Sequence, residues 1–327
     1  MKKLALILGS LLVVGTVTQA KEIIAVPTPI VVEDTTIVQP VVVEDVAVVA
    51  QNQPTLRVTN VGQSIEVDNN AGSENGNVGT IMLANTVGLA TENWTFGVMA
   101  RKGWNADTDN GFTNAGSDQS RIDLDAWRNF STENGSTYSL GARWRQETNK
   151  DSFYLRTKYD VGMFTGYADA KYVANEGSQN IYEIETMPVK LTVGTVTMGY
   201  YFDGKYGVGS GTTTNEGRNI NTTTSQIRAY FPIYKNDKIA LTGEYRLGLH
   251  KADRATETKT TELKGTNDYK FAQYNRAQLS LDYNYTENLS FSTYYAYEIT
   301  KPQQKATPSS NNQKYYGEFG LGWNYAF

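Results

Sequence analysis

The carboxyl-terminal segment 315–327 constrains the fold of this chain more than any other stretch. Every second position holds an apolar or aromatic residue in the run Phe319, Leu321, Trp323, Tyr325 and Phe327. The positions between them hold small or polar residues. Because successive side chains of a β-strand point to opposite faces, the segment is predicted to be a strand with one aromatic face and one small, polar face. A strand between lipid and a water-filled lumen accounts for both faces.

The same alternation recurs from residue 55 onward, in segments as long as a tilted membrane strand. We expect strands over 56–67, 80–90, 93–104, 120–130, 136–147, 152–163, 166–174, 181–193, 196–206, 224–233, 238–250, 271–285, 289–299 and 315–327. Segment 181–193 is clear only in its second half, where Met187, Val189, Leu191 and Val193 are expected to face outward. The count is about fourteen strands, within a range of roughly twelve to sixteen for weak segments.

The connections between these segments alternate between long and short. The long ones are 68–78, 105–119, 148–151 (a short exception), 175–180, 207–223, 251–270 and 300–314, and the short ones are 91–92, 132–135, 164–165, 194–195, 234–237 and 286–288. Thr-Glu-Asn occurs at 91–93, 132–134 and 286–288, where Asn is expected to adopt a left-handed conformation. The predicted fold is an all-β, transmembrane, antiparallel up-and-down barrel with short periplasmic turns and long extracellular loops.

Two further segments precede the predicted barrel at 55–327. Segment 1–20 has two lysines, an apolar run and small residues before Ala20, which predicts a secretory signal peptide cleaved after Ala20, with an uncleaved anchor as the alternative. Segment 21–54 is rich in Val and Pro and is expected to be a periplasmic spacer or tail, or else a plug or docking segment. The mean hydropathy is −0.46, and no segment after the leader resembles the apolar run of about 20 residues that a membrane helix needs.

The inward face of the predicted barrel is charged, which favours a conducting lumen over a filled one. The predicted pore-lining residues are Arg121, Asp123, Asp125, Arg143, Arg145, Arg156, Lys158, Asp160, Arg228, Glu244 and Arg246. Opposed basic and acidic walls would create a transverse field that orients polar solutes. The alternative is that these charges pair across neighbouring strands and only keep the lumen hydrated.

Catalytic and cofactor motifs are sparse. His250 is the only histidine, and a membrane hydrolase would need Ser280 or Ser292 beside it. Asp123 and Asp125 have the spacing of paired carboxylates, but two residues apart is also what a polar strand face gives by chance. No metal-ligand cluster or phosphate-binding loop is recognisable, so we expect no catalytic residue, no metal and no cofactor. The net charge of −4, which becomes −6 without the leader, disfavours nucleic-acid binding, and the absence of Cys means that the chain does not rely on disulfides.

Both ends of the chain carry a resemblance to a known family. The leader Met1–Gly15 and the terminal Gly322–Phe327 resemble the fusobacterial major outer-membrane proteins of the FomA type. The terminal aromatics Trp323, Tyr325 and Phe327 also look like the general signal read by the barrel-assembly machinery. The resemblance implies a general diffusion porin whose surface loops can serve in adhesion, and it carries over no individual pore residue.

Three hypotheses follow from the sequence. The first is an outer-membrane porin for passive diffusion of ions and small hydrophilic solutes. The second is an adhesin or structural barrel that binds other cell surfaces through loops 105–119, 207–223 and 251–270. The third is an outer-membrane hydrolase that uses His250. The expected partners are outer-membrane lipid and lipopolysaccharide, the barrel-assembly machinery and small solutes, with a homo-oligomer left open.

Overall fold

The computed structural model describes residues 55–69, 78–105, 119–176, 179–208, 221–253, 268–301 and 314–327. Within these residues the chain forms fourteen strands: β1 Arg57–Asn69, β2 Val78–Ala90, β3 Trp94–Asn105, β4 Gln119–Ser131, β5 Thr137–Glu147, β6 Lys150–Val161, β7 Phe164–Asn175, β8 Asn180–Val193, β9 Val196–Val208, β10 Asn221–Lys235, β11 Ile239–Asp253, β12 Tyr274–Asn284, β13 Leu289–Thr300 and β14 Lys314–Ala326. Each strand overlaps one of the segments expected from the sequence. The predicted leader 1–20, the spacer 21–54 and most of the long connections lie outside the described residues.

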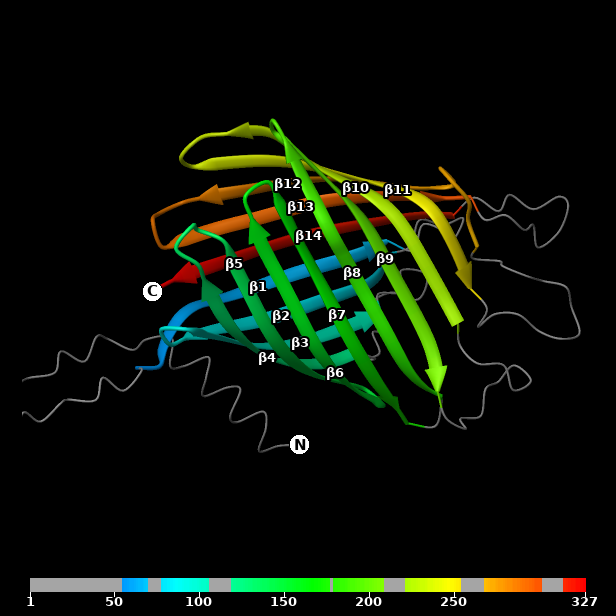
Figure 1. The fold of residues 1–327 in the computed structure, drawn as a ribbon, viewed down its shortest axis with the longest axis horizontal. Coiled ribbons are helices and arrows are strands. Elements are labelled where there is room, and N and C mark those ends of the chain that lie inside the picture. The colour runs from blue at the N-terminus through cyan, green and yellow to red at the C-terminus, as the bar shows by residue number, and fades with distance from the viewer. Residues whose placement is uncertain are drawn as a thin grey trace, which may run out of the picture. The chain divides into compact units, whose positions relative to one another are not determined.

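The strands close into a barrel. Each pairs antiparallel with its neighbours in sequence, and β1 pairs with β14 to complete the ring (Figure 1). At this closure Val61 lies opposite Tyr325 and Ile65 lies opposite Leu321. Closure leaves no strand edge with unpaired backbone groups, which is what a sheet surrounded by hydrocarbon requires. The predicted fold is therefore confirmed in strand count, direction and closure.

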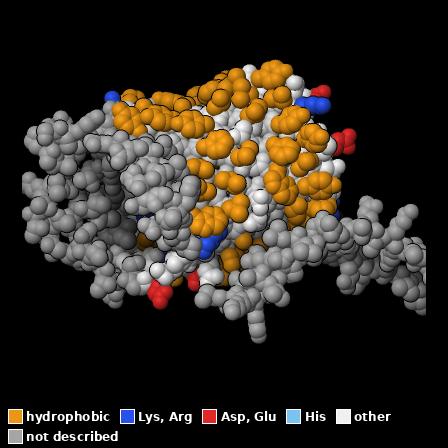
Figure 2. Space-filling model, turned by 180° about the vertical axis from the view of Figure 1, so that it is seen from behind, with side chains coloured by type: hydrophobic (Ala, Val, Ile, Leu, Met, Phe, Trp, Pro, Cys, Tyr) orange, Lys and Arg blue, Asp and Glu red, His pale blue; other side chains and the backbone are white. Residues whose placement is uncertain are grey.

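The outer face of the barrel is apolar. Large hydrophobic side chains are exposed along the strands, such as Leu124 (42%), Leu155 (58%) and Leu321 (49%). Figure 2 shows how hydrophobic side chains dominate this surface, with charged ones near its edges. A soluble protein rarely exposes an apolar patch larger than a few hundred Å². The outer surface therefore requires an apolar environment or a partner.

Three short turns are shaped by threonine. Thr91 accepts a hydrogen bond through Oγ1 from the N–H of Trp94 at 3.3 Å, and Thr286 accepts one from Leu289 at 2.9 Å. Thr132 instead donates through Oγ1 to the carbonyl of Ser136 at 3.1 Å. The expectation that the Asn of each Thr-Glu-Asn turn is left-handed is wrong, because none of the three has a positive φ. In each of the three turns the threonine hydroxyl supplies a stabilising hydrogen bond to the backbone instead.

Strand β8 contains an irregularity that reverses its faces. Its register against β9 shifts between Thr186 and Lys190, so alternation along β8 is out of phase on either side of the shift. Met187, expected to face outward, is only 1% exposed and lies against Gly199 on the lumen side, where a Cβ would meet its Sδ at 2.6 Å. Val189 (46% exposed) and Val193 (63% exposed) do face outward as expected.

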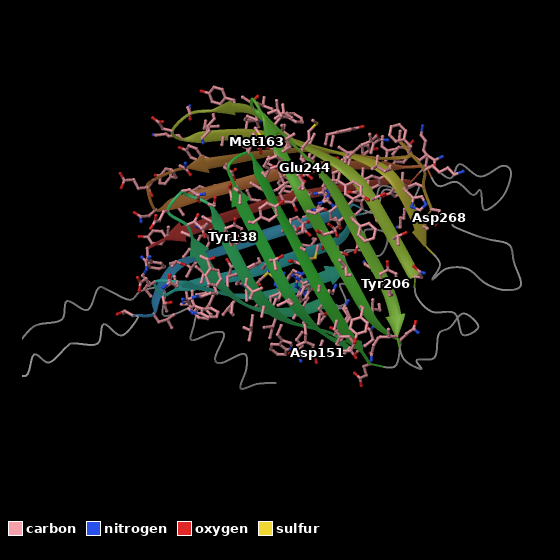
Figure 3. All side chains as sticks on the ribbon, in the orientation of Figure 1. Tyr138, Asp151, Met163, Tyr206, Glu244 and Asp268 are labelled. Carbon is pink, nitrogen blue, oxygen red and sulfur yellow. The ribbon has the colours of Figure 1, made fainter. Side chains whose placement is uncertain are left out.

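The described part of the chain contains no helix long and apolar enough to cross a membrane. Side chains project from both faces of the barrel wall (Figure 3). Met163, in the turn after β6, and Asp151, near the start of β6, mark the opposite ends of the barrel in that view.

Candidate functional site

The predicted pore residues all lie on the inner face of the barrel, the face away from the exposed apolar side chains. Arg121, Asp123 and Asp125 are on β4, Arg143 and Arg145 on β5, Arg156, Lys158 and Asp160 on β6, Arg228 on β10, and Glu244 and Arg246 on β11. Period-two alternation therefore identified the inner face of these five strands. The structure brings the β4–β6 members into one cluster and places Arg228, Glu244 and Arg246 on a separate part of the ring.

The β4–β6 cluster is a lattice of ion pairs that reaches β7. Asp123 is only 2% exposed, and its carboxylate lies 2.5 Å from Arg121 Nη2 and 3.0 Å from Arg145 Nε. Arg143 contacts it at 3.7 Å and contacts Asp125 at 2.8 Å. A buried carboxylate needs such partners to offset the loss of hydration.

Arg156 extends the lattice to β7. It lies 2.9 Å from Asp125 through Nη1 and 2.9 Å from Asp169 through Nε. We call Arg121, Asp123, Asp125, Arg143, Arg145, Arg156 and Asp169 the arginine wall. The alternative reading of the sequence, in which charges pair across neighbouring strands, describes these residues better than a purely basic wall does.

Trp127 lies against the arginine wall. Its indole covers Gly141 on β5, where a Cβ would lie 2.5 Å from Trp127 Cε3. Arg156 lies 4.8 Å and Lys158 lies 4.7 Å from the ring centroid, which is cation–π geometry. The aromatic ring therefore holds two cations close to the wall, and only the absence of a side chain at Gly141 allows it to lie flat.

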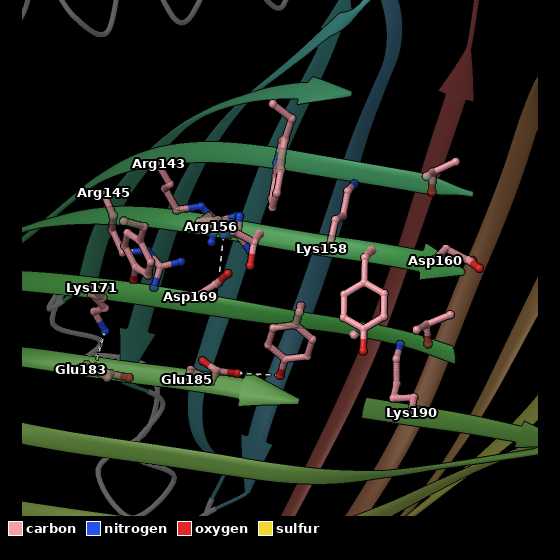
Figure 4. A pocket seen from close by; sticks show the side chains of 18 residues that line it. Arg143, Arg145, Arg156, Lys158, Asp160, Asp169, Lys171, Glu183, Glu185 and Lys190 are labelled. Carbon is pink, nitrogen blue, oxygen red and sulfur yellow. Dashed lines mark hydrogen bonds and ion pairs between the residues drawn. The ribbon is translucent and has the colours of Figure 1, made fainter. Parts of the chain in front are cut away.

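A polar cavity of about 980 Å³ lies in front of the β4–β8 part of the wall. Figure 4 shows the Arg156–Asp169 and Lys171–Glu183 ion pairs at its lining and the hydrogen bond from Tyr167 to Glu185. Lys158 and Lys190 also line it, and neither forms an ion pair with a described residue. The cavity therefore offers two uncancelled ammonium groups to a solute.

Several lining residues were missed in the sequence. They are Trp127, Tyr154, Tyr167, Lys171, Glu183, Glu185 and Lys190. The aromatic ones have the inward parity of their strands, but only charged residues were selected as pore-lining. Glu183 and Glu185 could not be assigned to the inner face because the β8 irregularity puts them on the opposite parity from Lys190. Lys171 and Lys190 follow from parity alone, because Ala170 and Tyr172, and Val189 and Leu191, were expected to face outward.

A different chemistry occupies the inner face around the closure of the barrel. The hydroxyl of Tyr294 on β13 lies 2.9 Å from Glu66 on β1 and 2.7 Å from Glu318 on β14. Tyr274 donates to Glu298 at 2.9 Å, and Arg276 contacts Glu318 at 3.3 Å. We call Glu66, Tyr274, Arg276, Tyr294, Glu298 and Glu318 the tyrosine wall. Its carboxylates are held mainly by neutral phenols, which do not cancel their charge.

One segment between β11 and β12 enters the lumen. Tyr269 is 2% exposed, its backbone bridges that of Lys251, and its ring lies over Gly248. Gln226 donates to its hydroxyl at 3.5 Å. Burial raises the pKa of the Tyr269 phenol, so this group stays neutral. The sequence had assigned residue 269 to an extracellular loop, and the structure instead uses it to narrow this end of the lumen.

The residues proposed for hydrolysis are not brought together. His250 is exposed and lies opposite Ser225, whereas Ser280 lies opposite Thr242 on the same strand as His250. The separation between positions 242 and 250 is about 26 Å at about 3.3 Å per residue. Asp123 and Asp125 are each bound by arginines, and no group of His, Cys, Asp and Glu in the described ranges could hold a metal ion.

The chain was compared with known protein families, curated proteins and solved structures. No protein family matches the sequence, and no curated protein matches it. The fold is similar to the translocator domain of the autotransporter NalP from Neisseria meningitidis, at 14% identity and a TM-score of 0.40, covering 85% of this chain and 90% of that one. It is similar to an anion-selective porin from Comamonas acidovorans, at 11% identity and a TM-score of 0.40, covering 84% and 100%.

A further structure with a similar fold is OmpT, an outer membrane protein of Vibrio cholerae, at 10% identity and a TM-score of 0.41, covering 83% of this chain and 98% of that one. These neighbours are outer-membrane β-barrels. Similarity this remote does not bear on what the chain does.

Proposed function

We propose that this chain is an outer-membrane porin, a water-filled channel for passive diffusion of ions and small hydrophilic solutes. One observation carries the proposal: a single closed wall is apolar on its outside and charged on its inside, with a polar cavity of about 980 Å³ within it. The outside suits hydrocarbon, and the inside must be hydrated. The strands are 11 to 15 residues long, enough to cross a bilayer at a tilt.

The location and assembly belong to the same proposal. A leader cleaved after Ala20 delivers the chain to the periplasm, and the FomA-type resemblance of both ends agrees with a bacterial outer membrane. Trp323, Tyr325 and Phe327 are 39%, 39% and 63% exposed, as an aromatic signal for the assembly machinery needs to be. The chain acts without catalysis, a proposal supported by the distance between His250 and Ser280 along the barrel.

Single-channel recording tests this proposal. Purified protein added to a planar lipid bilayer should produce stepwise increases in conductance, and the same protein unfolded by heat should not. Folded protein that inserts without any conductance steps would rule out the channel.

The absence of native Cys allows a sharper version of this recording. Lys158→Cys places a thiol in the cavity, and Leu155→Cys places one on the outer face of the same strand. A water-soluble, bulky thiosulfonate reagent should lower the conductance of the Lys158→Cys channel and leave the Leu155→Cys channel unchanged. Equal effects in both variants would contradict conduction through this lumen.

A further inference from the structure

Arg128 is a cation on the apolar outer face of the barrel. It lies on β4 next to the inward-facing Trp127, opposite Trp94 on β3 and Leu140 on β5. Its guanidinium lies 5.6 Å from the ring centroid of Trp94 and 5.8 Å from that of Phe130. Among its neighbours, Trp94 is 40% exposed, Leu140 49% and Phe130 48%. Arg128 therefore lies within the surface that would contact lipid.

Arg128 lacks an anionic partner. It forms no ion pair or hydrogen bond with the described residues, in contrast to the arginines of the arginine wall, which share carboxylates. An arginine near the membrane midplane costs about 2–4 kcal/mol, and the cost falls toward about 0–1 kcal/mol near the interface. Arg128 lies close to the short-turn end of β4, at the level where an anion can reach it.

A hollow of about 530 Å³ lies beside Arg128 on the same face. Its floor includes Ala126 and Ala142, which lie opposite each other, and its sides are Phe96, Leu124, Trp144 and Phe153. Ala126 is two residues from Arg128, a distance of about 7 Å along the strand. Trp94 and Phe96 stack at 6.1 Å, so the aromatic surface is continuous from the cation to the hollow.

We propose that the outer face of β3–β6 binds one glycerophospholipid, with its phosphate on Arg128 and an acyl chain in the hollow. A guanidinium can donate two parallel hydrogen bonds to phosphate oxygens, and the two flanking rings leave this group oriented but unpaired. The small side chains of Ala126 and Ala142 leave room that a flexible chain can fill. The charge at one end of an apolar hollow matches a phospholipid, whose anionic group and acyl chain are joined.

This inference rests on the membrane location in the proposed function, and it does not depend on conduction. Delipidated protein in mild detergent would be titrated with dioleoylphosphatidylglycerol, and native mass spectrometry would count the lipid retained. Wild type should retain one lipid, and Arg128→Gln should weaken its binding at least about ten-fold because hydrogen bonds to a charged group are lost. Ala142→Leu should weaken binding as well, since it fills the hollow and leaves Arg128 intact.

Two probes separate the parts of the ligand, and one variant controls for surface charge. Glycerol phosphate lacks the acyl chains and dioleoylglycerol lacks the phosphate, so each should bind much more weakly than the whole lipid. Lys102→Gln removes a cation of the neighbouring strand β3, whose ammonium group donates to Ser120 at 3.2 Å. This variant should bind lipid like wild type. Heat-dependent gel mobility of each variant would show that the barrel is folded.

Equal lipid retention by wild type, Arg128→Gln and Ala142→Leu would overturn the inference. So would a stable dimer that excludes lipid and dissociates on Arg128→Gln, because a second copy would then occupy the face. Tight binding of glycerol phosphate alone would mean that the site recognises only a phosphate, which would also overturn the inference. Selective lipid binding by an electrically silent barrel would sink the porin proposal alone, and conductance without selective lipid binding would sink only this one.

Discussion

The two walls of the lumen hold their carboxylates in different ways. On the arginine wall each aspartate contacts at least one guanidinium, and Asp123 is enclosed by three. On the tyrosine wall a single phenol, Tyr294, lies between Glu66 and Glu318. A guanidinium cancels the charge that it binds, whereas a phenol only donates a hydrogen bond. Carboxylate charge is thus neutralised on one wall and largely retained on the other.

The difference shows where the electrical asymmetry of this lumen originates. Counting charged residues suggested a basic group on β4–β6, but most of those cations are paired with aspartates on adjacent strands. At the cavity, Lys158 and Lys190 form no ion pair with a described residue, and neither do the carboxylates of Asp160 and Glu185. Around the barrel closure the negative charge is in excess, since among the described residues Glu66 and Glu298 form no ion pair and only Arg276 contacts Glu318. Four tests examine this comparison.

The largest effect is expected from removing the carboxylate at the centre of the arginine wall. Asp123→Ala leaves Arg121, Arg143 and Arg145 close together without their shared anion. Breaking a buried ion-pair group costs about 3 kcal/mol, and we expect a fall of that size in the free energy of unfolding, measured by urea titration in lipid vesicles. Asp160→Ala is the matched control, because Asp160 lies on the same inner face, lines the cavity and forms no ion pair with a described residue. Equal losses in both variants would mean that the lattice is not stabilising.

The next effect concerns the ring that covers the arginine wall. Gly141→Ala places a Cβ 2.5 Å from Trp127 Cε3, so the indole must leave the wall and enter the lumen. Overpacking of this kind costs about 2 kcal/mol, and we expect lower single-channel conductance as well as lower stability. Gly97→Ala is the control, since its Cβ would meet Asp125 Cβ at an ordinary 3.5 Å. Unchanged conductance in Gly141→Ala would show that Trp127 does not border the conducting path.

A smaller effect is expected on the tyrosine wall. Tyr294→Phe removes the hydroxyl between Glu66 and Glu318 and keeps the ring that covers Gly320. The loss should be about 1 kcal/mol in the free energy of unfolding, as for one hydrogen bond. Tyr295→Phe, on the outward-facing neighbour that is 54% exposed, should change it by much less. A larger loss in Tyr294→Phe than in Asp123→Ala would reverse the order of the two walls.

The smallest energetic effect is on ion preference. Replacing both Lys158 and Lys190 by Glu makes the cavity lining strongly negative, and the permeability ratio of cation to anion should rise roughly two-fold or more at low salt. Reversal potentials in a salt gradient measure that ratio. Lys238→Glu, in the short turn between β10 and β11, is the control outside the cavity. An unchanged reversal potential in the double variant would mean that paired charges, and not these lysines, govern ion preference.

Strand positions and faces were largely predictable because apolar and polar residues alternate along the sequence with a period of two. Asp123, Arg145 and Lys158 were placed on the inner face by parity alone. Their partners were not predictable, since pairing depends on the register between neighbouring strands, such as Asp123 opposite Arg145. Inward aromatics such as Trp127 and Tyr294 have the parity of the inner face, but their packing over a glycine of an adjacent strand also depends on register and was not predictable. The predictions for the turn asparagines and for Met187 were wrong because local backbone geometry, the turn conformation and the β8 register shift, does not follow from alternation.

The register shift in β8 has a consequence for how the length of this chain can vary. Before the shift, Glu183 and Glu185 point to water, and after it Lys190 does so on the opposite parity. Deleting one residue between 187 and 189 would remove this irregularity, and Lys190 would then face the lumen in uninterrupted alternation with Glu183 and Glu185. The length of β8 can therefore vary by one amino acid at the shift, whereas elsewhere in a strand the same change would move every following side chain to the other face.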